Sequence, residues 1–495
     1  MKNKIVLLSL LFSIVLLLFS PHLTFSRGRY RPGDWVSYTV LRYVTSIAKD
    51  FNYIYFGTTG GVSRYDWMDE EWETPLTTSD GLLDNRIRRI AYDLEKDEFW
   101  FETYLGACLY QPTFQEWYSG GRFPDNLVKR DNPDSLPPQF LMEYGYGYYQ
   151  EGYIMDLNLN RYKITATLKD DWGNLWIGTW GLNAGRGYLR YLDLDMFKFG
   201  LYDSDVKAVL LDGETMWFGG TGDFYRSTGI TRFNRKDNLW DYFESRYLPG
   251  LCSNDVTVIE KDSTYIWFGT TDGLARYNKK KIIWRSFTTF KGLRDDYITA
   301  LKSDEEVLWV GTKGGLNFYW FKKDSIGIIP SNLVKGAYIY AIEADKNYVW
   351  VGTDFGVLRM DKKTGEWSRF NTPEGILSGK ITSITKNGDE LWFASSYGLL
   401  GYNTSTNQRE ALSSQFDFPG KYPNQIIADS KNIWVCTDIG VWKRERKTKI
   451  WTHFTKEDGL LDNEVQCMLL DGDYIWFGTP KGATKFFWNN PLRID

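Results

Sequence analysis

The chain has 495 residues and a formal net charge of -4, with 59 basic against 63 acidic side chains. A nucleic-acid-binding domain needs a basic face, so this balance argues against nucleic acid as a partner. Aromatic residues make up 17% of the chain, with 22 Trp and 46 Gly, which is typical of many short strands joined by tight turns.

The first 26 residues have the features of an export signal. Lys2 and Lys4 give a positive amino end, residues 5–19 are apolar, and residues 24–26 (TFS) offer small side chains for cleavage. An apolar run of about 15 residues is short for a membrane span, which needs roughly 20. We expect cleavage after Ser26, no membrane span after signal removal, and a periplasmic or secreted location. An uncleaved N-terminal anchor is the alternative.

One stretch recurs along the rest of the chain. Residues 266–278 (IWFGTTDGLARYN) read as an apolar strand, a turn and a second, alternating strand. Copies follow one another at about 42 residues, with one long gap from Trp100 to Trp176, and this regular period indicates a repeat architecture. The repeated aromatic residue stands at Tyr55, Trp100, Trp176, Trp217, Trp267, Trp309, Trp350, Trp392, Trp434 and Trp476.

Each full repeat reads as four strands, the outermost resembling residues 451–455 (WTHFT). Residues 35–39 (WVSYT) match this outer strand but precede the first inner strand, and the last repeat stops after its third strand. An N-terminal strand that completes the C-terminal blade is how a β-propeller closes. We predict an all-β fold over residues 27–495: a β-propeller of about ten four-stranded blades. Two smaller propellers, or a blade or two outside the ring, are the alternatives.

The motif Ile-Thr-x-Ile, followed by Asp and by Asn-x-Trp-x-Gly-Thr-x-x-Gly-Leu-x-x-Tyr, resembles the two-component regulator propeller repeat. Residues 381–384 with Leu391 and Trp392, and residues 170–179, carry it most clearly, and the resemblance covers residues 35–488. In that family the repeat forms the extracytoplasmic sensor part of many bacterial hybrid histidine kinases. The resemblance implies a sensor-like propeller. We expect no kinase or DNA-binding part in this chain, so phosphorylation signalling is not carried over.

The repeated residues themselves have a structural interpretation. We expect each repeated Trp to pack between neighbouring blades, where an indole buries a large apolar area. Acidic residues in the linkers between repeats could ring the channel mouth and bind a cation, but such residues more often cap turns; they are Asp84, Asp295, Asp296 and Asp462. We therefore predict no metal and no cofactor. Of the four Cys, Cys436 and Cys467 could form a bridge, although four small buried side chains are the simpler expectation.

Three consecutive places break the period. The long gap holds an insertion at residues 119–161, which includes residues 142–153 (MEYGYGYYQEGY). The next two loops between second and third strands read as enlarged, over residues 180–187 and 221–229. Insertions on one face of a repeat scaffold are frequent binding sites. We expect all three to project from the channel-mouth face of blades two to four.

This cluster is the predicted ligand-binding site. Its aromatic side chains suit stacking on sugars or peptides, and its polar ones suit hydrogen bonding. The predicted residues are Tyr144, Tyr146, Tyr148, Tyr149, Trp180, Asn183, Arg186, Asp223, Tyr225 and Arg226. The function predicted is an exported ligand-binding or sensor-like protein that recognises a glycan or peptide. An insertion without a ligand, and a protein–protein interaction scaffold, are the alternatives.

Catalysis is the weakest alternative. The mature chain keeps a single His, His453, within an outer-strand pattern, so schemes that need two His are disfavoured. The sequence contains no Gly-x-Ser-x-Gly elbow and no phosphate-cradling loop. Carboxylate-based glycan cleavage stays open, because 63 acidic residues can hide a catalytic pair.

Overall fold

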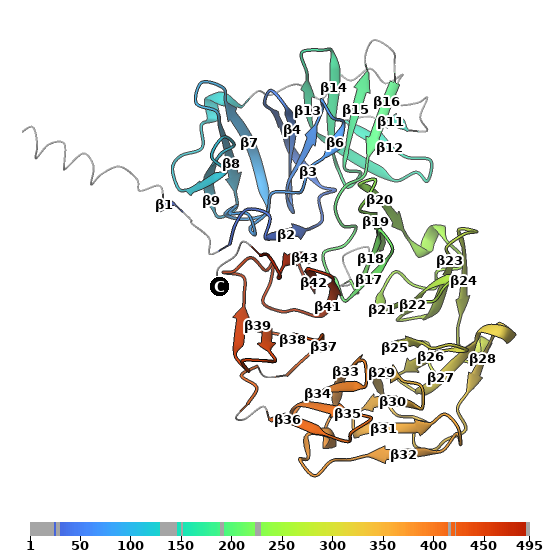
Figure 1. Ribbon diagram of the computed structural model, residues 1–495. Helices are drawn as coiled ribbons and strands as arrows, with labels where there is room; N and C mark the ends of the chain where they lie inside the picture. Colours follow the sequence, from blue (N-terminus) through green and yellow to red (C-terminus); the bar gives the residue numbers. More distant parts are fainter. Residues whose placement is uncertain are drawn as a thin grey trace, which may run out of the picture. The chain divides into compact units, whose positions relative to one another are not determined.

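The structure is a computed structural model of the chain (Figure 1). It describes residues 24–25, 30–128, 146–149, 152–188, 193–222, 229–413, 417–420 and 422–491. These residues form antiparallel sheets joined by turns, which confirms the all-β prediction. Five short 3-10 segments interrupt the described turns: η1 (Asp125–Leu127), η3 (Ser245–Tyr247), η4 (Thr289–Lys291), η5 (Phe321–Lys323) and η6 (Ile376–Ser378).

The chain folds into two compact units. The second unit contains Gly33–Val40 and Lys198–Asp495, and Leu41–Phe197 belongs to the first. The chain therefore contributes one strand to the second unit, builds the first unit, and then returns. No helix in the described ranges is long and apolar enough to cross a membrane. Residues 1–23 and 26–29 lie outside the described residues, so the export signal stays a prediction.

The second unit contains seven four-stranded sheets. The first three are β17 (Ala208–Asp212), β18 (Thr215–Gly219), β19 (Ile230–Asn234) and β20 (Leu239–Phe243); β21 (Val256–Lys261), β22 (Tyr265–Thr270), β23 (Gly273–Asn278) and β24 (Ile283–Phe287); and β25 (Ile298–Ser303), β26 (Val307–Thr312), β27 (Gly315–Trp320) and β28 (Ser325–Ile328). The next two are β29 (Ile339–Ala344), β30 (Tyr348–Thr353), β31 (Gly356–Asp361) and β32 (Trp367–Phe370); and β33 (Ile381–Asn387), β34 (Glu390–Ser395), β35 (Gly398–Asn403) and β36 (Arg409–Ser413). The last two are β37 (Gln425–Ala428), β38 (Asn432–Thr437), β39 (Gly440–Glu445) and β40 (Trp451–Phe454); and β41 (Cys467–Asp471), β42 (Tyr474–Thr479), β43 (Gly482–Phe487) and β2 (Trp35–Tyr38).

The N-terminal strand closes the last sheet, as predicted. β2 pairs antiparallel with β43, from Trp35 opposite Phe486 to Tyr38 opposite Ala483. The Trp35 and Phe486 rings stack with centroids 3.9 Å apart, and the strand is buried along its whole length. Closure removes the exposed edge that the third strand would otherwise leave.

The first strands of the seven sheets form a closed ring. Each lies beside the first strand of the next sheet, and β17 also lies beside β41, which completes the circle (Figure 1). The prediction of one ring of about ten blades is therefore corrected. The place beside the last sheet is taken by the fourth repeat, because the first three repeats fold into a separate unit.

The first unit contains the other three sheets. They are β3 (Val44–Lys49), β4 (Tyr53–Thr58), β5 (Gly61–Asp66) and β6 (Glu71–Trp72); β7 (Ile87–Asp93), β8 (Glu98–Thr103), β9 (Gly106–Gln111) and β10 (Glu116–Ser119), with β1 (Thr24–Phe25) paired to β10; and β11 (Gly147–Tyr149), β12 (Tyr153–Met155), β13 (Arg161–Lys169), β14 (Asn174–Trp180), β15 (Ala184–Tyr188) and β16 (Asp193–Phe197). In this unit β3 lies between β7 and β13.

The repeated Trp is a core residue, and at five positions its indole N–H has an Asp acceptor, whereas the buried indole N–H groups of Trp392 and Trp434 have no acceptor within the described residues. Trp267 is fully buried, and its ring centroid lies 4.7 Å from that of Tyr319 in the next sheet. Its indole N–H donates to Asp262 over 2.6 Å, and Asp262 also accepts the backbone N–H groups of the turn it occupies. Equivalent indole–Asp bonds recur at Trp176, Trp309, Trp350 and Trp476. The structural interpretation of these residues is confirmed.

A repeated Thr joins neighbouring sheets. The Thr257 hydroxyl lies 3.0 Å from the carbonyl of Gly269 in its own sheet and 2.7 Å from that of Ile298 in the next. Thr382 makes the same pair of contacts between its own sheet and the linker that follows. The Thr of the Ile-Thr-x-Ile motif therefore joins a first strand to the following repeat at two places in the ring.

Candidate functional site

A cavity of about 260 Å³ runs between the first strands of all seven sheets in the second unit. Its wall includes residues 207–209 at the start of β17 and Tyr340 of β29. It also includes Met468 of β41 and Gln466, which directly precedes that strand. Because every first strand contributes to the wall, this cavity is the central channel of the ring. Its mouth is the natural place to look for a ligand site.

Tyr340 departs from the repeat at this channel. It holds the position that Thr257, Thr299 and Thr382 hold in other sheets, directly after the first buried residue of the first strand. A Tyr ring cannot make the short hydroxyl bridge that Thr257 and Thr382 make; Thr299 does not make it either, and Lys207, Asn424 and Gln466 fill the position in the remaining sheets. Burial and a hydrogen bond to Asp354 raise the pKa of Tyr340, which keeps its hydroxyl protonated.

Tyr340 belongs to an aromatic cluster flanked by two lysines. Its ring stacks on that of Tyr338, with centroids 4.2 Å apart and planes 14° apart, and the Lys380 Nζ lies 4.2 Å from its centroid. In the preceding sheet the Lys313 Nζ lies 3.3 Å from the Tyr297 centroid. Within the described residues neither lysine has a carboxylate within ion-pair distance. Both ammonium groups therefore rest on tyrosine faces at the rim and can pair with a ligand.

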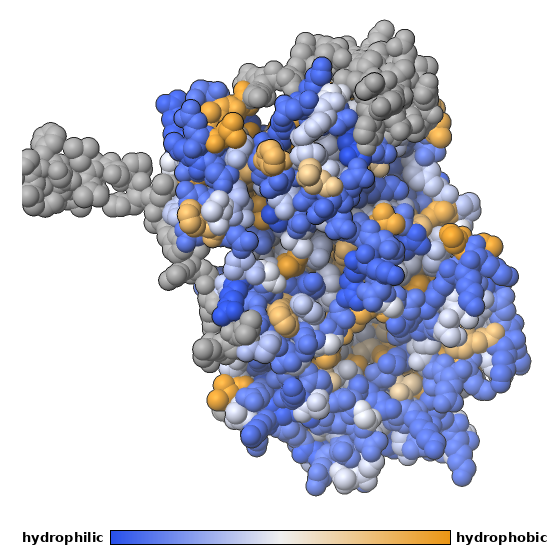
Figure 2. All heavy atoms as spheres, turned by 45° about the horizontal axis from the view of Figure 1, so that its top comes forward, coloured by the Kyte–Doolittle hydropathy of each residue, from blue (hydrophilic) through white to orange (hydrophobic). Residues whose placement is uncertain are grey.

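The turns beside this cluster expose apolar side chains at one repeated position. Phe355, Tyr397 and Ile439 are 71%, 55% and 50% exposed, and they occupy the turns of three successive sheets from β29–β32 to β37–β40. The backbone N–H of each of these three residues donates to the hydroxyl of the Thr or Ser two positions earlier. The three residues therefore occupy equivalent backbone positions. On the face drawn in Figure 2 the surface is mainly hydrophilic, so this alignment is a local departure.

These turns lie at the channel mouth. Within single sheets the backbone N–H of Lys313 donates to the carbonyl of Tyr297, and that of Ser396 donates to the carbonyl of Lys380. The turn between second and third strands is thereby held against the residue that enters the first strand. We name this region the mouth arc: Tyr297, Lys313, Tyr338, Tyr340, Phe355, Lys380, Tyr397 and Ile439.

Of the site residues predicted from sequence, Arg186 is buried in the first unit and makes its contacts there. It stands opposite Trp176 on neighbouring strands, the place that Arg276 takes opposite Trp267. It is buried, its guanidinium lies over the Trp176 ring, and it forms ion pairs of 3.2 Å with Glu70 and 3.1 Å with Asp195. Its position is that of a repeat residue, and its charge is met inside the fold.

The loop expected at residues 180–187 is a short turn. β14 ends at Trp180 and β15 begins at Ala184, so three residues connect them. Asn183 is buried and adopts a left-handed φ of 58°, which lets the chain reverse early, and its carbonyl accepts from the Thr179 backbone N–H and hydroxyl. Trp180 is 48% exposed and contacts the Tyr43 ring at 5.1 Å. The expectation of an enlarged loop here was wrong.

The insertion at 119–161 covers two sheet faces of the first unit. Among the described sheets of the first unit, ordered β13, β3, β7, that of Trp100 has no following neighbour. Phe123, Leu127 and Val128 pack in the cluster of Trp100 instead. At the other end β12 pairs with β13, and its Ile154 is fully buried against Ile164. Tyr146 packs on the same cluster.

The remaining predicted site residues are described in part or not at all. Tyr148 and Tyr149 lie on β11, with Tyr148 opposite Ile154. Tyr144, Asp223, Tyr225 and Arg226 lie outside the described residues. Residues 221–229 fall in the second unit and the insertion in the first, so the expected meeting of these loops, and the place of the insertion at the channel mouth, stay predictions.

The linker acids cap turns. Asp295 accepts the Tyr297 backbone N–H at 2.8 Å and Asp296 accepts that of Thr289 at 2.6 Å, while Asp84 and Asp462 accept local N–H groups in the same way. Their other partners are bases such as Arg86 and Lys481. Across the described ranges no group of three or more His, Cys, Asp or Glu side chains could hold a metal ion. The four Cys are free thiols, and Cys108, Cys436 and Cys467 are buried.

The mouth arc was missed by the sequence reasoning, although a signal was present. The motif at 338–341 reads Tyr-Ile-Tyr-Ala, where three other sheets of the ring have Thr at the third place and none has an aromatic residue. The predicted site rests on changes in loop length, and Tyr340 leaves the length unchanged. His453, the single His of the predicted mature chain, stacks on Trp442 with centroids 3.9 Å apart, and its Nε2 lies 2.9 Å from the carbonyl oxygen of Ile439.

The fold and the channel define a β-propeller with a second, three-sheet unit. No family model and no curated protein matches the sequence. The chain is similar to the extracellular domain of a protein described as a hybrid two-component system from B. thetaiotaomicron, at 20% identity and a TM-score of 0.50, over 91% of this chain and 62% of that one. The chain thus spans less than two thirds of that neighbour.

Two further solved structures are similar over different shares of the chain. One is virginiamycin B lyase from Staphylococcus aureus, at 17% identity and a TM-score of 0.46, over 57% of this chain and 94% of that one. The other is the extracellular domain of a protein described as a one-component system from B. thetaiotaomicron, at 17% identity and a TM-score of 0.32, over 90% and 70%. At such identities the first neighbour supports the sequence resemblance at the level of the fold.

Proposed function

We propose that this chain is an extracytoplasmic, sensor-like propeller that binds a glycan or a peptide at the mouth arc. The observation that carries the proposal is Tyr340, the aromatic residue at a position that is Thr, Lys, Asn or Gln in the other six sheets; it lines the channel and stacks with Tyr338. An aromatic residue at an otherwise polar position of a channel mouth is more easily explained by recognition than by folding.

The chemistry of the arc fits both ligand classes. Half-buried tyrosines and the exposed rings of Phe355 and Tyr397 offer flat apolar surfaces with polar tips. Sugars and peptide side chains stack on such rings, while the lysine ammonium groups donate hydrogen bonds to hydroxyl, carbonyl or carboxylate oxygens. The site proposed here lies on sheets β25–β28 to β37–β40, since Asn183 and Arg186 serve the fold.

The location belongs to the same proposal. The solved neighbour with a TM-score of 0.50 is described as an extracellular domain. The positive and apolar features of residues 1–26 point to export. Together these support a periplasmic or secreted protein whose signal segment is residues 1–26.

The decisive variant is Tyr340→Thr, which introduces the residue that three other sheets of the ring have at this position, so we expect the fold to be kept. A thermal-shift screen of oligosaccharides and peptides comes first, because a ligand at about 100 times its Kd stabilises by about 2.7 kcal/mol. We expect the shift of any hit to vanish in Tyr340→Thr and to persist in Phe290→Ser, which changes a fully exposed ring in a linker. A hit that binds both variants equally would remove the mouth arc as the site.

A protein-interaction scaffold is the second candidate, and one observation favours it. In the first unit Trp67 and Trp172 stack with centroids 3.9 Å apart, and Trp172, Phe51 and Met68 are 58%, 79% and 63% exposed. Exposed apolar groups of this size on neighbouring turns are common at protein interfaces. Replacing Trp172 by Ser should leave ligand shifts at the mouth arc unchanged.

A further inference from the structure

Four basic residues join neighbouring sheets of the ring on the side of the turns between first and second strands. The residue that directly follows the third strand reaches an acidic side chain of the preceding sheet. The pairs are Lys279 with Asp212 at 2.9 Å, Lys362 with Asp304 at 2.5 Å, Arg235 with Asp471 at 2.5 Å and Arg446 with Glu390 at 2.6 Å. The chain thus repeats one cation position at four of the seven boundaries, and the other three have Phe321, Thr404 and Trp488 there.

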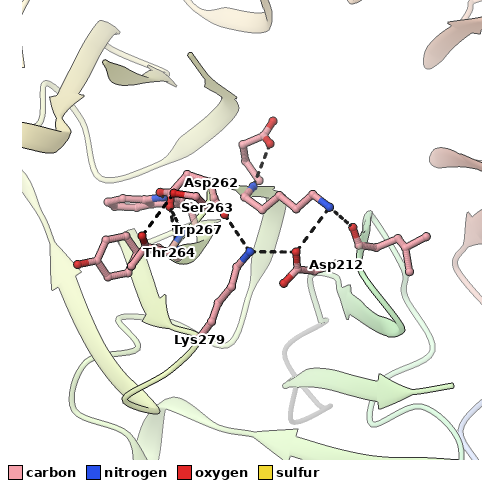
Figure 3. Close-up of polar contacts among 10 residues, drawn as sticks. Asp212, Asp262, Ser263, Thr264, Trp267 and Lys279 are labelled. Atoms are coloured by element: carbon pink, nitrogen blue, oxygen red, sulfur yellow. Dashed lines mark hydrogen bonds and ion pairs between the residues drawn. The ribbon is translucent and has the colours of Figure 1, made fainter. Parts of the chain in front are cut away.

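Lys279 shows how the position is built. Its Nζ lies between the Asp212 carboxylate of the preceding sheet and the backbone carbonyl of Asp262 in its own sheet, at 2.8 Å from the latter (Figure 3). Lys362 repeats the arrangement, with its Nζ 2.6 Å from the Asp345 carbonyl. The position therefore offers a carboxylate from one sheet and a carbonyl from the next.

At the boundary between sheets β21–β24 and β25–β28 this position holds Phe321. Its backbone N–H donates to Glu306 over 3.2 Å, the same register as Lys279 to Thr264 and Lys362 to Asn347. Phe321 packs 6.5 Å from the Trp267 centroid and supplies no charge. At this boundary the residue after the third strand therefore packs on the repeated Trp but supplies no cation.

A groove lies where the cation would be. It has a volume of about 560 Å³, and its wall contains Asp262, Tyr265, Asp304 and Phe321 with the hydroxyls of Ser263 and Ser303. Within the described residues no Lys or Arg comes within ion-pair distance of the Asp262 carboxylate. Lys362 already pairs with Asp304. Of the described carboxylates in the wall, Asp262 and Glu305 have no ion pair, and Asp262 is the one at the position that Asp212 and Asp304 hold in the repeated contact.

Asp262 has room for another donor. Its Oδ1 accepts the backbone N–H groups of Thr264 and Tyr265, and its Oδ2 accepts the Trp267 indole N–H. A carboxylate oxygen takes two hydrogen bonds, so Oδ2 retains one site. Asp304 demonstrates the double use, because its Oδ2 accepts both the Trp309 indole and the Lys362 ammonium.

We propose that this groove binds a basic side chain of a partner polypeptide, whose ammonium group takes the place that Lys279 and Lys362 occupy elsewhere in the ring. The Asp262 carboxylate and the Asp304 carbonyl would receive its N–H groups. Phe321 provides an aromatic wall, and a cation is attracted to the face of an aromatic ring. The other aromatic ring of the wall, Tyr265, is already covered by the Arg276 guanidinium, 4.3 Å from its centroid. The site is separate from the mouth arc, and its partner need not be the ligand of that arc.

Calorimetric titration of the full chain at low ionic strength tests the proposal. The probes are an acetylated pentapeptide with one Lys between glycines, its Gln counterpart, and cadaverine as a free amine. We expect the Lys peptide to bind, to weaken as salt is added, and to lose at least about tenfold in affinity in Asp262→Asn. Asp345→Asn is the matched control, because Asp345 has the same indole and turn contacts and does not line this groove.

Phe321→Lys is the second variant, because it supplies the missing cation from within the chain. We expect this variant to bind none of the probes while keeping its thermal transition near that of the native chain. Equal binding of the Lys and Gln peptides, or equal affinity of the native chain and Asp262→Asn, would overturn the proposal. Binding of cadaverine without the Lys peptide would overturn the assignment to a polypeptide partner.

Discussion

A single Asp makes two kinds of contact in several repeats of the chain. The Asp of the first turn caps its own turn and fixes the indole N–H of the repeated Trp, as Asp345 does for Trp350 at 2.8 Å. A buried indole without an acceptor would cost about 1–3 kcal/mol. The Asp and the Trp are therefore coupled, and a change at either position affects both the turn and the core.

A buried carboxyl in the first unit makes a pH dependence predictable. Burial raises the pKa of Asp80 to about 6, against which the hydrogen bonds from the Thr77 backbone N–H (2.8 Å) and hydroxyl (3.1 Å) act only in part. The folded state then holds a proton that the unfolded chain releases near pH 4. Its stabilising effect is complete below about pH 4 and is lost as pH rises through about 6.

The expected size of this effect is about 2 kcal/mol in the free energy of unfolding of the first unit. Urea denaturation at pH 4 and pH 7 measures it, and Asp80→Asn should remove most of the difference. Asp458→Asn is the control, since Asp458 accepts the same two hydrogen bonds from Thr455. An unchanged pH dependence in Asp80→Asn would show that another group is responsible.

At the scale of single residues, the roles of residues that recur at one spacing could be predicted from the sequence. The role of a residue that differs at one copy of the repeat could not. The packing role of the repeated Trp was predictable because ten copies stand at one spacing. Arg186 was assigned to a loop because its strand lacks the usual Gly-Leu start, whereas the structure places it on β15 opposite Trp176. Tyr340 went unnoticed because a substitution within a strand alters no spacing.

Among the elements, the insertion shows how one segment can replace a neighbouring blade. In the ring, each repeated Trp packs on the apolar strand of the next sheet, as Trp350 does on Phe393 at 5.8 Å. In the first unit Phe123 covers Trp100, and the strand β12 covers Ile164 and Ile177 through Ile154. Both exposed faces of the three-sheet row are thus covered by chain from one insertion.

This arrangement could not be predicted from composition. The Tyr- and Gly-rich stretch of the insertion is as compatible with a binding loop as with a covering hairpin, since aromatic residues serve both. The difference depends on which sheets are neighbours, and that is a tertiary property. The four strands of each repeat, by contrast, follow from local alternation and turn residues, and they were predicted correctly.

The covering role predicts a strong effect of Ile154→Asp. An unpaired carboxylate in this apolar cluster should destabilise the first unit by several kcal/mol. Leu157→Asp, in the turn after β12 and 83% exposed, is the matched control with little expected effect. Hydrogen exchange should show faster exchange in β13 and β14 for Ile154→Asp alone. Slow exchange in both variants would mean that the hairpin is dispensable.

For the whole molecule, closure was predictable and ring size was not. The match of residues 35–39 to an outer strand depends on local pattern, and the pairing of β2 with β43 confirms it. Which repeat lies beside the last one depends on how many sheets close the ring. The sequence of a single repeat does not determine that number. The polar contacts at that boundary, such as Arg235 with Asp471, use side chains common to many repeats.

The mouth arc and the basic-side-chain groove both assume a ring of seven sheets. Cross-linking the boundary between the fourth and last repeats tests this directly. The Gln466 side-chain N–H donates to the Asp205 carboxylate over 2.7 Å, so cysteines at both positions should be joined by a short bismaleimide linker. Mass spectrometry should recover the linked peptides from Asp205→Cys/Gln466→Cys and from neither single variant. Failure to form this link in the folded chain would contradict the seven-sheet ring.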